Sequence, residues 1–254
     1  MNNSYITPNW HAPSNVCGLT TTRLGGLSDA PFDSFNLGAH VGDEAGCVEA
    51  NRLKLMHIAD LPHMPNWLNQ THSVSVATIK SGQLSTVDAD AVYTNEINTV
   101  CAILTADCLP VLFVNKAGNE IAAAHAGWRG LVNGILENTI NCFNANPQDI
   151  LVWFGPAIGP KYFEVGQDVF DAFLNIDSEC AFAFQPCINH DDQSLDKPKY
   201  LANLYSLAKH RLMRCGLSDF YGADRCTASE SEYFYSYRRD NKTGRMATLI
   251  WLTR

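Results

Sequence analysis

Residues 99–130 read TVCAILTADCLPVLFVNKAGNEIAAAHAGWRG, and this stretch contains three short, largely apolar runs. They are Thr99 to Leu104, Val111 to Val114 and Glu120 to Ala124, and residues such as Asp, Asn, Gly and Pro bound them. A fourth run of this kind is Ile150 to Phe154. Short apolar runs between turn-forming residues are typical of strands that are buried on both faces. The four runs therefore predict the centre of a sheet.

Helical periodicity follows on the C-terminal side of this stretch. Apolar residues recur at spacings of three and four within 132–143 and again within 200–212, and Gly216 ends the second pattern. That spacing places the apolar side chains on one face of a helix. We therefore expect two amphipathic helices that cover the sheet, with a shorter third helix over 167–174.

The remaining patterns extend the sheet and mark one loop. Residues 75–80 and 246–252 are further strand candidates, and the second is rich in Thr, Ile and Trp. Residues 177–198 have the composition of turns and predict a surface loop. No long Pro-, Ser- or Gly-rich linker divides the 254 residues, so we expect a single α/β domain over residues 1–254.

Composition narrows the setting in which the protein works. The formal net charge is -8 and Arg238–Arg239 is the only adjacent basic pair, which argues against nucleic acid as a partner. The N-terminus lacks the pattern of a signal peptide, and no window approaches a membrane span. The nine cysteines show no CxxC spacing and no disulfide pattern. We expect a cytoplasmic protein with free thiols, no membrane association and no obligate protein partner.

One cysteine and two histidines stand at predicted strand ends or in polar turns. His72 lies in Asn-Gln-Thr-His-Ser, Cys108 follows Thr-Ala-Asp after a strand, and His125 precedes Ala-Gly-Trp-Arg-Gly at a helix start. If the three side chains converge, they form either a zinc site with an open fourth position or a Cys108–His125 nucleophilic pair. Their spacing matches no local metal signature and leaves both alternatives open. Either alternative makes the protein an enzyme.

Four other polar residues are candidates for contact with a substrate or a proton. Asp107 precedes Cys108 and is placed either to move a proton or to cap a turn. Arg23, beside a glycine pair, and Arg129, at the predicted helix start, are candidate phosphate ligands because arginine grips phosphate with a bidentate fork. Asn36 is a candidate polar contact, and its alternative role is to hold a turn.

A series of short motifs runs over nearly the full chain: Thr22 to Gly26, Phe35 to Gly38, Gln70 to Ser73, Asp88 to Ala91, Thr105 to Val111, His125 to Gly130, Gly155 to Gly159 and Tyr235 to Asp240. Together these motifs resemble the YfiH family, the bacterial relatives of the laccase-domain protein FAMIN, which are also described as polyphenol oxidases. The resemblance implies a layered α-β-β-α sandwich with mixed sheets, similar to the fold of some cysteine hydrolases. It also implies a zinc ion on His72, Cys108 and His125.

The activities attributed to the resembled family are diverse. They include phosphorolysis of the purine nucleosides adenosine, inosine and methylthioadenosine, adenosine deamination, copper-dependent phenol oxidation and the editing of peptidoglycan precursors. The resemblance, and no residue pattern, ranks phosphorolysis above deamination. We therefore expect a zinc-dependent purine nucleoside phosphorylase with adenosine deaminase activity, and a purine nucleoside and phosphate as its small-molecule partners.

The residues themselves weigh differently on these activities. Deamination uses a metal-activated water most directly, whereas phosphorolysis needs an anion subsite beside the ribose. A multicopper centre needs several His-x-His pairs, and none of the eight histidines has that spacing, although copper in the Cys/His/His pocket would permit slow phenol oxidation in vitro. The alternative held open is hydrolysis of a peptidoglycan-precursor amide, by a metal ion or by Cys108 as a nucleophile.

Overall fold

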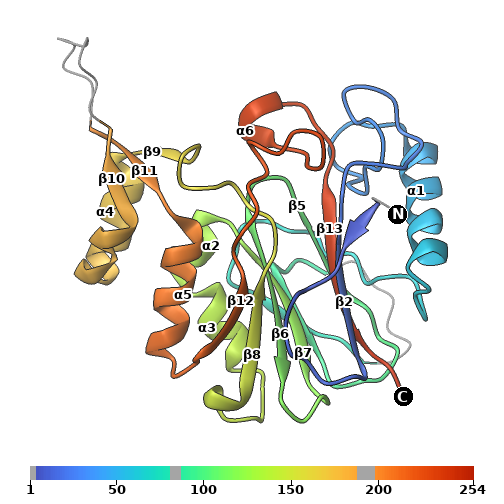
Figure 1. Ribbon diagram of the computed structural model, residues 1–254, viewed down its shortest axis with the longest axis horizontal. Helices are drawn as coiled ribbons and strands as arrows, with labels where there is room; N and C mark the ends of the chain where they lie inside the picture. The colour runs from blue at the N-terminus through green and yellow to red at the C-terminus, as the bar shows by residue number, and fades with distance from the viewer. Residues whose placement is uncertain (1–3, 81–86, 188–197) are drawn as a thin grey trace.

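Two sheets lie face to face in the computed structural model, which describes residues 4–80, 87–187 and 198–254 (Figure 1). The larger sheet is mixed and has six strands in the order β12 (Asp219–Gly222), β8 (Ile150–Phe154), β6 (Leu109–Asn115), β7 (Ile121–Ala126), β4 (Ala91–Thr94) and β3 (Val76–Thr78). The smaller sheet is antiparallel, with the order β1 (Tyr5–Ile6), β2 (Val16–Thr21), β13 (Met246–Leu252) and β5 (Cys101–Thr105). A short third sheet joins β10 (Phe184–Pro186), β11 (Lys199–Ala202) and β9 (Glu164–Gly166).

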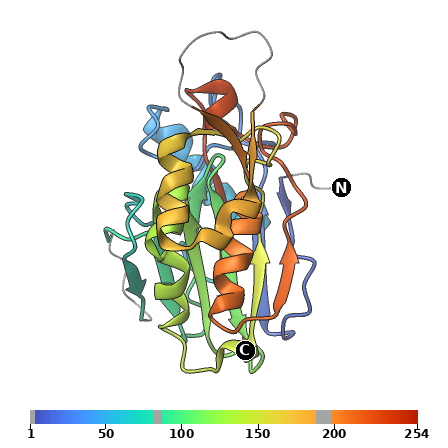
Figure 2. The same ribbon diagram turned by 90° about the vertical axis from the view of Figure 1, so that its left-hand side faces the viewer.

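Helices cover the outer faces of both large sheets. Three of them lie against the six-stranded sheet: α2 (Trp128–Asn133), α3 (Ile135–Ile140) and α5 (Leu204–Arg214) (Figure 2). A fourth, α4 (Gln167–Ile176), packs outside α2 and against β9 and β11 of the short sheet (Figure 1). On the other side, α1 (Ala45–Ile58) covers the four-stranded sheet. The expectation of an α-β-β-α sandwich is thereby confirmed. Within the described residues, no helix is both long enough and apolar enough to span a membrane.

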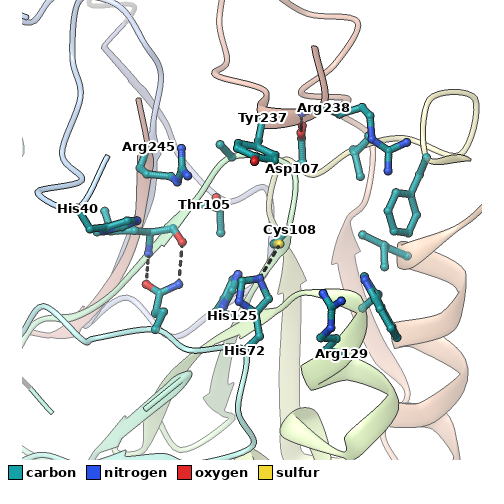
Figure 3. A pocket seen from close by; sticks show the side chains of 17 residues that line it. His40, His72, Thr105, Asp107, Cys108, His125, Arg129, Tyr237, Arg238 and Arg245 are labelled. Carbon is teal, nitrogen blue, oxygen red and sulfur yellow. Dashed lines mark hydrogen bonds between the residues drawn. The ribbon is translucent and has the colours of Figure 1, made fainter. Parts of the chain in front are cut away.

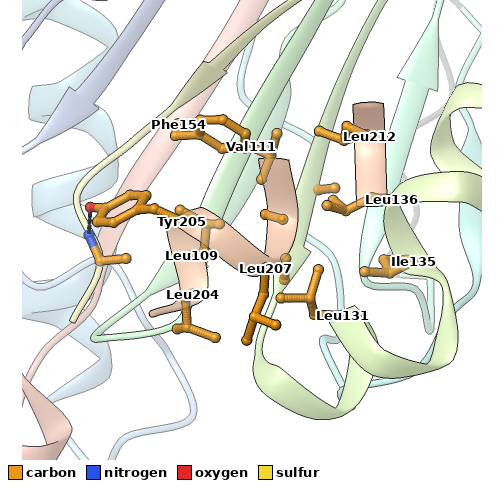
Figure 4. Close-up of a cluster of buried hydrophobic side chains, with 14 of the residues drawn as sticks. Leu109, Val111, Leu131, Ile135, Leu136, Phe154, Leu204, Tyr205, Leu207 and Leu212 are labelled. Atoms are coloured by element: carbon orange, nitrogen blue, oxygen red, sulfur yellow. Dashed lines mark hydrogen bonds between the residues drawn. The ribbon is translucent and has the colours of Figure 1, made fainter. Parts of the chain in front are cut away.

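Each central strand contributes side chains to two layers of the core, because alternate residues point to opposite faces of its sheet. Val111 and Phe113 of β6 point toward the helices, and Leu112 and Val114 point into the space between the sheets. Because both faces of a central strand meet apolar layers, all seven residues of β6 are buried. Figure 4 shows the helical side of this arrangement, where α5 packs on β6 and β8. This double burial explains the continuous apolar runs of the sequence.

The predicted strands are present, with small shifts at their ends. β8 spans Ile150–Phe154 and β13 spans Met246–Leu252, as predicted. The strands predicted from Thr99, Val111 and Glu120 are β5, β6 and β7, and all residues of these three strands are buried.

The helix predictions need two corrections. The helix predicted over 132–143 is two helices, α2 and α3, because Gly134 between them has a φ of 101°, which ends a right-handed helix. The helix predicted over 200–212 begins at Leu204, since residues 199–202 form β11. The third predicted helix is α4.

The loop predicted over 177–198 is partly wrong. Residues Ser178–Ala183 form a 3-10 helix (η2), and Phe184–Pro186 form β10, which pairs with β11 through main-chain hydrogen bonds. Pairing with a strand that lies further along the chain is not visible in local composition. Residues 188–197 of the predicted loop lie outside the described residues.

Candidate metal and catalytic site

A cavity of about 500 Å³ opens at one end of the larger sheet (Figure 3). Its wall combines the turn from Thr105 to Cys108, the end of β7 with the start of α2, the short helix α6 (Tyr237–Asp240) and Arg245, just before β13. Because β6 and β7 are antiparallel, the start of one and the end of the other meet at this same edge. The cavity therefore gathers segments that are distant in the sequence.

The structure brings His72, Cys108 and His125 together at the floor of this cavity. Their potential ligand atoms all lie within 4.8 Å of one another. The Cys108 Sγ is 3.7 Å from His72 Nε2, and the two imidazole rings are 4.8 Å apart between centroids. The register of β6 and β7 places Pro110 opposite His125, so Cys108, directly before β6, lies beside the ligand-bearing end of β7.

Local backbone geometry at the two turns is unusual. His72 has a φ of 61° and Asp107, the neighbour of Cys108, has a φ of 89°. Positive φ at residues other than glycine is uncommon and is often retained where a functional group must be aimed. Both turns are therefore set to direct side chains into the cavity.

Asp90 forms hydrogen bonds with both histidine residues of the site. Its fully buried carboxylate accepts hydrogen bonds from the backbone N–H groups of Thr71, His72 and Ser73 and from the Ser73 hydroxyl. It also accepts one from His125 Nδ1 at 2.8 Å, which leaves Nε2 of that ring for the cavity. A carboxylate that fixes the far nitrogen of an imidazole in this way is the usual support of a metal-ligating histidine.

Sequence reasoning missed Asp90 as a functional residue. It stands in one of the motifs that carry the family resemblance, but no spacing relates it to His72 or His125. The one local sign is a charged residue directly before β4, a strand whose four residues are all buried.

Charge within the site is mutually stabilised. Burial alone would raise the pKa of Cys108, but the two imidazoles lower it to about 6. Burial would likewise lower the pKa of His125, whereas the Cys108 thiolate and Asp90 raise it to about 9. Hydrogen bonds from His125 and Ser73 hold the pKa of Asp90 below its ordinary value, despite its burial. The protein thus favours a thiolate at Cys108.

The three residues fit a zinc ion in number, type and spacing. With Zn–S of about 2.3 Å and Zn–N of about 2.0–2.1 Å, tetrahedral ligand atoms lie about 3.5 Å apart, close to the 3.7 Å between Cys108 Sγ and His72 Nε2. A thiolate and two imidazoles are also borderline-soft donors that zinc prefers. The chemistry and geometry of the donor set therefore match a three-ligand site with one open position.

Gly127 provides the space in which His72 and Cys108 approach each other. A Cβ at this position would lie 2.7 Å from His72 Cδ2 and 3.1 Å from Cys108 Sγ. Its backbone conformation is one that alanine also adopts, so only this contact opposes a side chain.

We expect Gly127→Ala to weaken zinc binding by roughly 10-fold or more, the scale seen when the support of metal ligands is disturbed. The reason is that the added methyl displaces His72 from Cys108. Zinc affinity measured by competition with a chromophoric chelator checks this. Gly46→Ala in α1 is the matched control, because its nearest neighbour would be 3.9 Å away, and unchanged zinc affinity in both variants would contradict the account.

Asp107 lies at the cavity, but its carboxylate is already engaged. It accepts hydrogen bonds from the hydroxyls of Thr227 (2.6 Å) and Ser236 (3.0 Å) and from the backbone N–H of Arg238 (2.6 Å). These bonds tie the turn that carries Cys108 to the start of α6. The sequence left two roles open for Asp107, and the geometry favours the capping of a turn and a helix rather than the transfer of a proton.

The predicted substrate contacts separate into one at the cavity and two away from it. Arg129 lines the cavity, with its guanidinium over the Trp128 ring at 4.4 Å. Arg23 does not line it and is instead paired with Asp33 at 3.2 Å. Asn36 is fully buried, and its Oδ1 accepts the backbone N–H of Arg245 at 2.9 Å. Asn36 therefore holds a turn that supports a cavity residue.

Two cavity arginines were not among the selected substrate contacts. Arg238 and Arg245 line the cavity together with Arg129, and none of the three has a carboxylate partner within the described part of the chain. Five other arginines do form ion pairs with carboxylates: Arg23, Arg211, Arg214, Arg225 and Arg239. Asp107 is the one carboxylate among the described lining residues. The cavity is therefore cationic in a chain of net charge -8.

A second group of potential metal ligands is already engaged in a hydrogen bond and an ion pair. Asp177, Cys180 and His210 also lie within 4.8 Å of one another. His210 Nε2 is bonded to the Asp177 carboxylate at 2.8 Å, and Arg214 pairs with the same carboxylate. The nitrogen that would bind a metal is thus already used, and a guanidinium cation lies beside it. This group connects η2 to α5.

Comparison with known proteins identifies the family. Residues 17–253 match the family described as multi-copper polyphenol oxidoreductase laccase. The chain is 53% identical over 247 residues to the purine nucleoside phosphorylase of Haemophilus influenzae, with 97% of this chain and 98% of that protein covered. It is 51% identical to the purine nucleoside phosphorylase YfiH of Escherichia coli K12, again with 97% and 98% covered.

Solved structures agree with this assignment. The crystal structure of Neisseria meningitidis protein NMB0706 superimposes with a TM-score of 0.91 at 46% identity, covering 99% of this chain and 100% of that one. The Bacillus licheniformis protein YfiH superimposes with a TM-score of 0.84 at 30% identity, covering 94% and 93%. The resemblance expected from the sequence is confirmed, and the chain belongs to the laccase-like polyphenol oxidoreductase family that includes the YfiH proteins.

Proposed function

We propose that this protein is a zinc-dependent purine nucleoside phosphorylase that acts on adenosine, inosine and methylthioadenosine, and that its full chain forms one catalytic domain. The observation that carries the proposal is a cavity that combines a Cys/His/His ligand set with three arginines lacking carboxylate partners. The choice of a purine nucleoside and phosphate as substrates rests on the names of the relatives, which are purine nucleoside phosphorylases. A cationic cavity is the environment that an inorganic phosphate requires.

His72, Cys108 and His125 would hold the zinc ion, and its chemistry there would be that of a Lewis acid that stabilises developing negative charge. Asp90 accepts the Nδ1 proton of His125 in a hydrogen bond, so the ring presents Nε2 in a fixed orientation. The positive charge of the cavity attracts phosphate, and an arginine whose guanidinium is free on one edge would bind and orient it through charge-assisted hydrogen bonds. The apolar wall excludes water, which would otherwise hydrolyse the nucleoside in place of phosphate.

The phosphorolytic step exchanges one bond for another at C1′ of the ribose. An oxygen of inorganic phosphate forms a bond to C1′ while the bond from C1′ to the purine nitrogen breaks. The electron pair leaves with the base, which takes up a proton, and the products are the free purine and ribose 1-phosphate. Attack and departure occur on roughly opposite sides of C1′, so phosphate and purine need separate subsites.

Adenosine deamination is a second activity that we propose for the same site. Its reaction replaces the exocyclic amino group by an oxygen from water, and a Lewis-acid metal with an open coordination position favours that step. Release of inosine from adenosine without phosphate would reveal this activity. It would also separate deamination from phosphorolysis in one assay.

A cysteine-dependent amidase that edits peptidoglycan precursors is the alternative supported by a specific observation. The His125 imidazole lies between the other two groups of this set, with the Asp90 carboxylate on its Nδ1 and the Cys108 sulfur close to the same ring. This is the arrangement of an activated cysteine nucleophile. A nucleophilic cysteine does not explain His72 beside Cys108 and needs no zinc, so chelation distinguishes the two functions.

The test of the proposed function is release of hypoxanthine from inosine by purified, zinc-loaded protein, with and without phosphate. We expect release only with phosphate, together with stoichiometric ribose 1-phosphate. Equal release without phosphate would show hydrolysis instead. No release at all, combined with cleavage of an amide-bearing cell-wall precursor after chelation, would support the cysteine amidase.

A further inference from the structure

The cavity has two chemically different sides with Cys108 between them. Figure 3 shows His40 and Arg245 on one side of Cys108, and Arg129 on the other, with Arg238 beyond Asp107 in that same direction. Arg129 lies over the Trp128 ring at 4.4 Å and Arg238 over the Phe163 ring at 5.5 Å, so both aromatic rings belong to the second side. This division suits a reaction in which nucleophile and leaving group lie on opposite sides of one carbon.

Arg245 is the cavity arginine that is most firmly fixed. Its Nη1 donates to the carbonyl oxygens of Thr243 and Gly244, both at 3.0 Å. Its backbone N–H is held by Asn36, and a Cβ on Gly38 would lie 2.8 Å from its Cγ, so the side-chain stem packs tightly on the backbone. Burial lowers the pKa of this guanidinium below its ordinary value. Arg245 is thus set in position before any ligand binds.

The remaining edge of the Arg245 guanidinium is available to a ligand. Its Nε and Nη2 donate no hydrogen bond to any residue that the structure describes. These two nitrogens form the fork that matches two oxygens of a phosphate. The guanidinium lines the same cavity as Cys108, Asp107 and His40, and Figure 3 shows it beside His40 on one side of Cys108.

The other two arginines are placed differently. Arg238 also donates from Nη1 to two carbonyl oxygens, those of Tyr162 and Glu164 at 3.3 and 2.9 Å, but its side chain is exposed whereas that of Arg245 is half-buried. Arg129 is exposed and has no hydrogen bond within the described residues, so its only fixed contact is the Trp128 ring. All three guanidinium groups lie over an aromatic ring, that of Arg245 over Tyr237 at 5.9 Å, so Arg245 is distinguished by its burial and by the contacts that fix its backbone and stem.

The side of the cavity near Arg129 and Arg238 is largely apolar. Its lining includes the rings of Trp128 and Phe163 and the buried aliphatic side chains of Ile158 and Leu204, all within one core cluster. Flat aromatic and aliphatic surfaces bind the face of a purine, whereas they offer nothing to a phosphate.

We infer that inorganic phosphate binds at the free Nε/Nη2 edge of Arg245, beside His40, and that the purine binds on the Trp128–Phe163 side, with the ribose across Cys108. The inference rests on the proposed function in assigning the ligands. It adds which of the three cavity arginines selects phosphate and which wall selects the base.

Equilibrium binding of inorganic phosphate tests this assignment without requiring turnover. We expect Arg245→Gln to weaken phosphate binding by about 10- to 100-fold, the loss of a bidentate charge-assisted contact, as measured by isothermal titration calorimetry of zinc-loaded protein. Arg129→Gln is the matched control, because it removes the same charge from the same cavity, and we expect it to change phosphate affinity less than about threefold, as for a weak, exposed charge. Zinc content and far-ultraviolet circular dichroism confirm that both variants remain folded and loaded.

Steady-state kinetics provides the complementary readout. Arg245→Gln should raise KM for phosphate with little change in KM for inosine, and Trp128→Leu should do the reverse. Wild-type phosphate affinity in Arg245→Gln, or an equal loss in Arg129→Gln, would overturn the assignment. If wild-type protein binds phosphate through Arg245 but releases no base, the proposed function fails while the phosphate site stands.

Discussion

Cys108→Ala is expected to remove the bound zinc and to reduce phosphate-dependent release of hypoxanthine by at least about 10³-fold, since a metal Lewis acid contributes several kcal/mol to such a step. The physical reason is that Cys108 supplies the only thiolate of a three-ligand site. Alanine leaves two imidazoles, which hold zinc far more weakly. Zinc content by mass spectrometry and initial rates on the same preparation check both parts of the prediction.

Two further variants make this result interpretable. Cys47→Ala, in α1 and away from the cavity, should retain zinc and full activity, which controls for loss of a cysteine as such. Cys108→Ser removes the thiolate but keeps a nucleophilic oxygen of similar size. Full zinc content and undiminished turnover in Cys108→Ala would contradict the role of Cys108 as a ligand.

Asp90→Asn is expected to lower zinc affinity by roughly 10- to 100-fold, because the carboxylate positions both imidazole ligands. In the wild type, four N–H donors share the two carboxylate oxygens of Asp90. An asparagine keeps the shape but replaces one of these oxygens with an NH₂ group, which cannot accept their hydrogen bonds. At least one buried donor then lacks an acceptor, so we also expect the free energy of unfolding to fall by about 1–3 kcal/mol. Chelator competition and chemical denaturation measure the two effects separately.

Asp107→Asn is the matched comparison for Asp90→Asn. It makes the same chemical change next to Cys108, but its carboxylate contacts Thr227, Ser236 and the N–H of Arg238, and neither histidine. We expect lower stability and a smaller loss of zinc affinity than in Asp90→Asn, because neither imidazole ligand loses its hydrogen-bond acceptor. Equal losses of zinc affinity in both variants would show that Asp90 has no special positioning role.

The central strands could be predicted from the sequence because their burial requires a continuous run of apolar residues. β5, β6, β7 and β8 are apolar at nearly every position, since one face of each strand meets the other sheet and the opposite face meets helices. It did not predict the break at Gly134, because the apolar spacing continues through the glycine into α3. Periodicity records which face is buried, and it does not record where the backbone turns.

The site was predictable to the extent that its residues stand at strand ends. Cys108 and His125 were selected because they stand at predicted strand ends, and His72 because it lies in a polar turn, and the structure brings the three together. Arg23 had the same kind of local support, a neighbouring glycine pair, yet its guanidinium pairs with Asp33. Asp90 reaches the site through the pairing of β4 with β7, and Arg245 through the packing of the two sheets, so no local spacing relates either residue to the ligands.

The most direct test of the central claim is a zinc titration of chelated protein, with inosine turnover followed at saturating phosphate and without phosphate. The account predicts no base release from the chelated protein and a rise that reaches its plateau at one zinc per chain, in the presence of phosphate alone. Base release that persists after chelation, or that proceeds equally without phosphate, would contradict it.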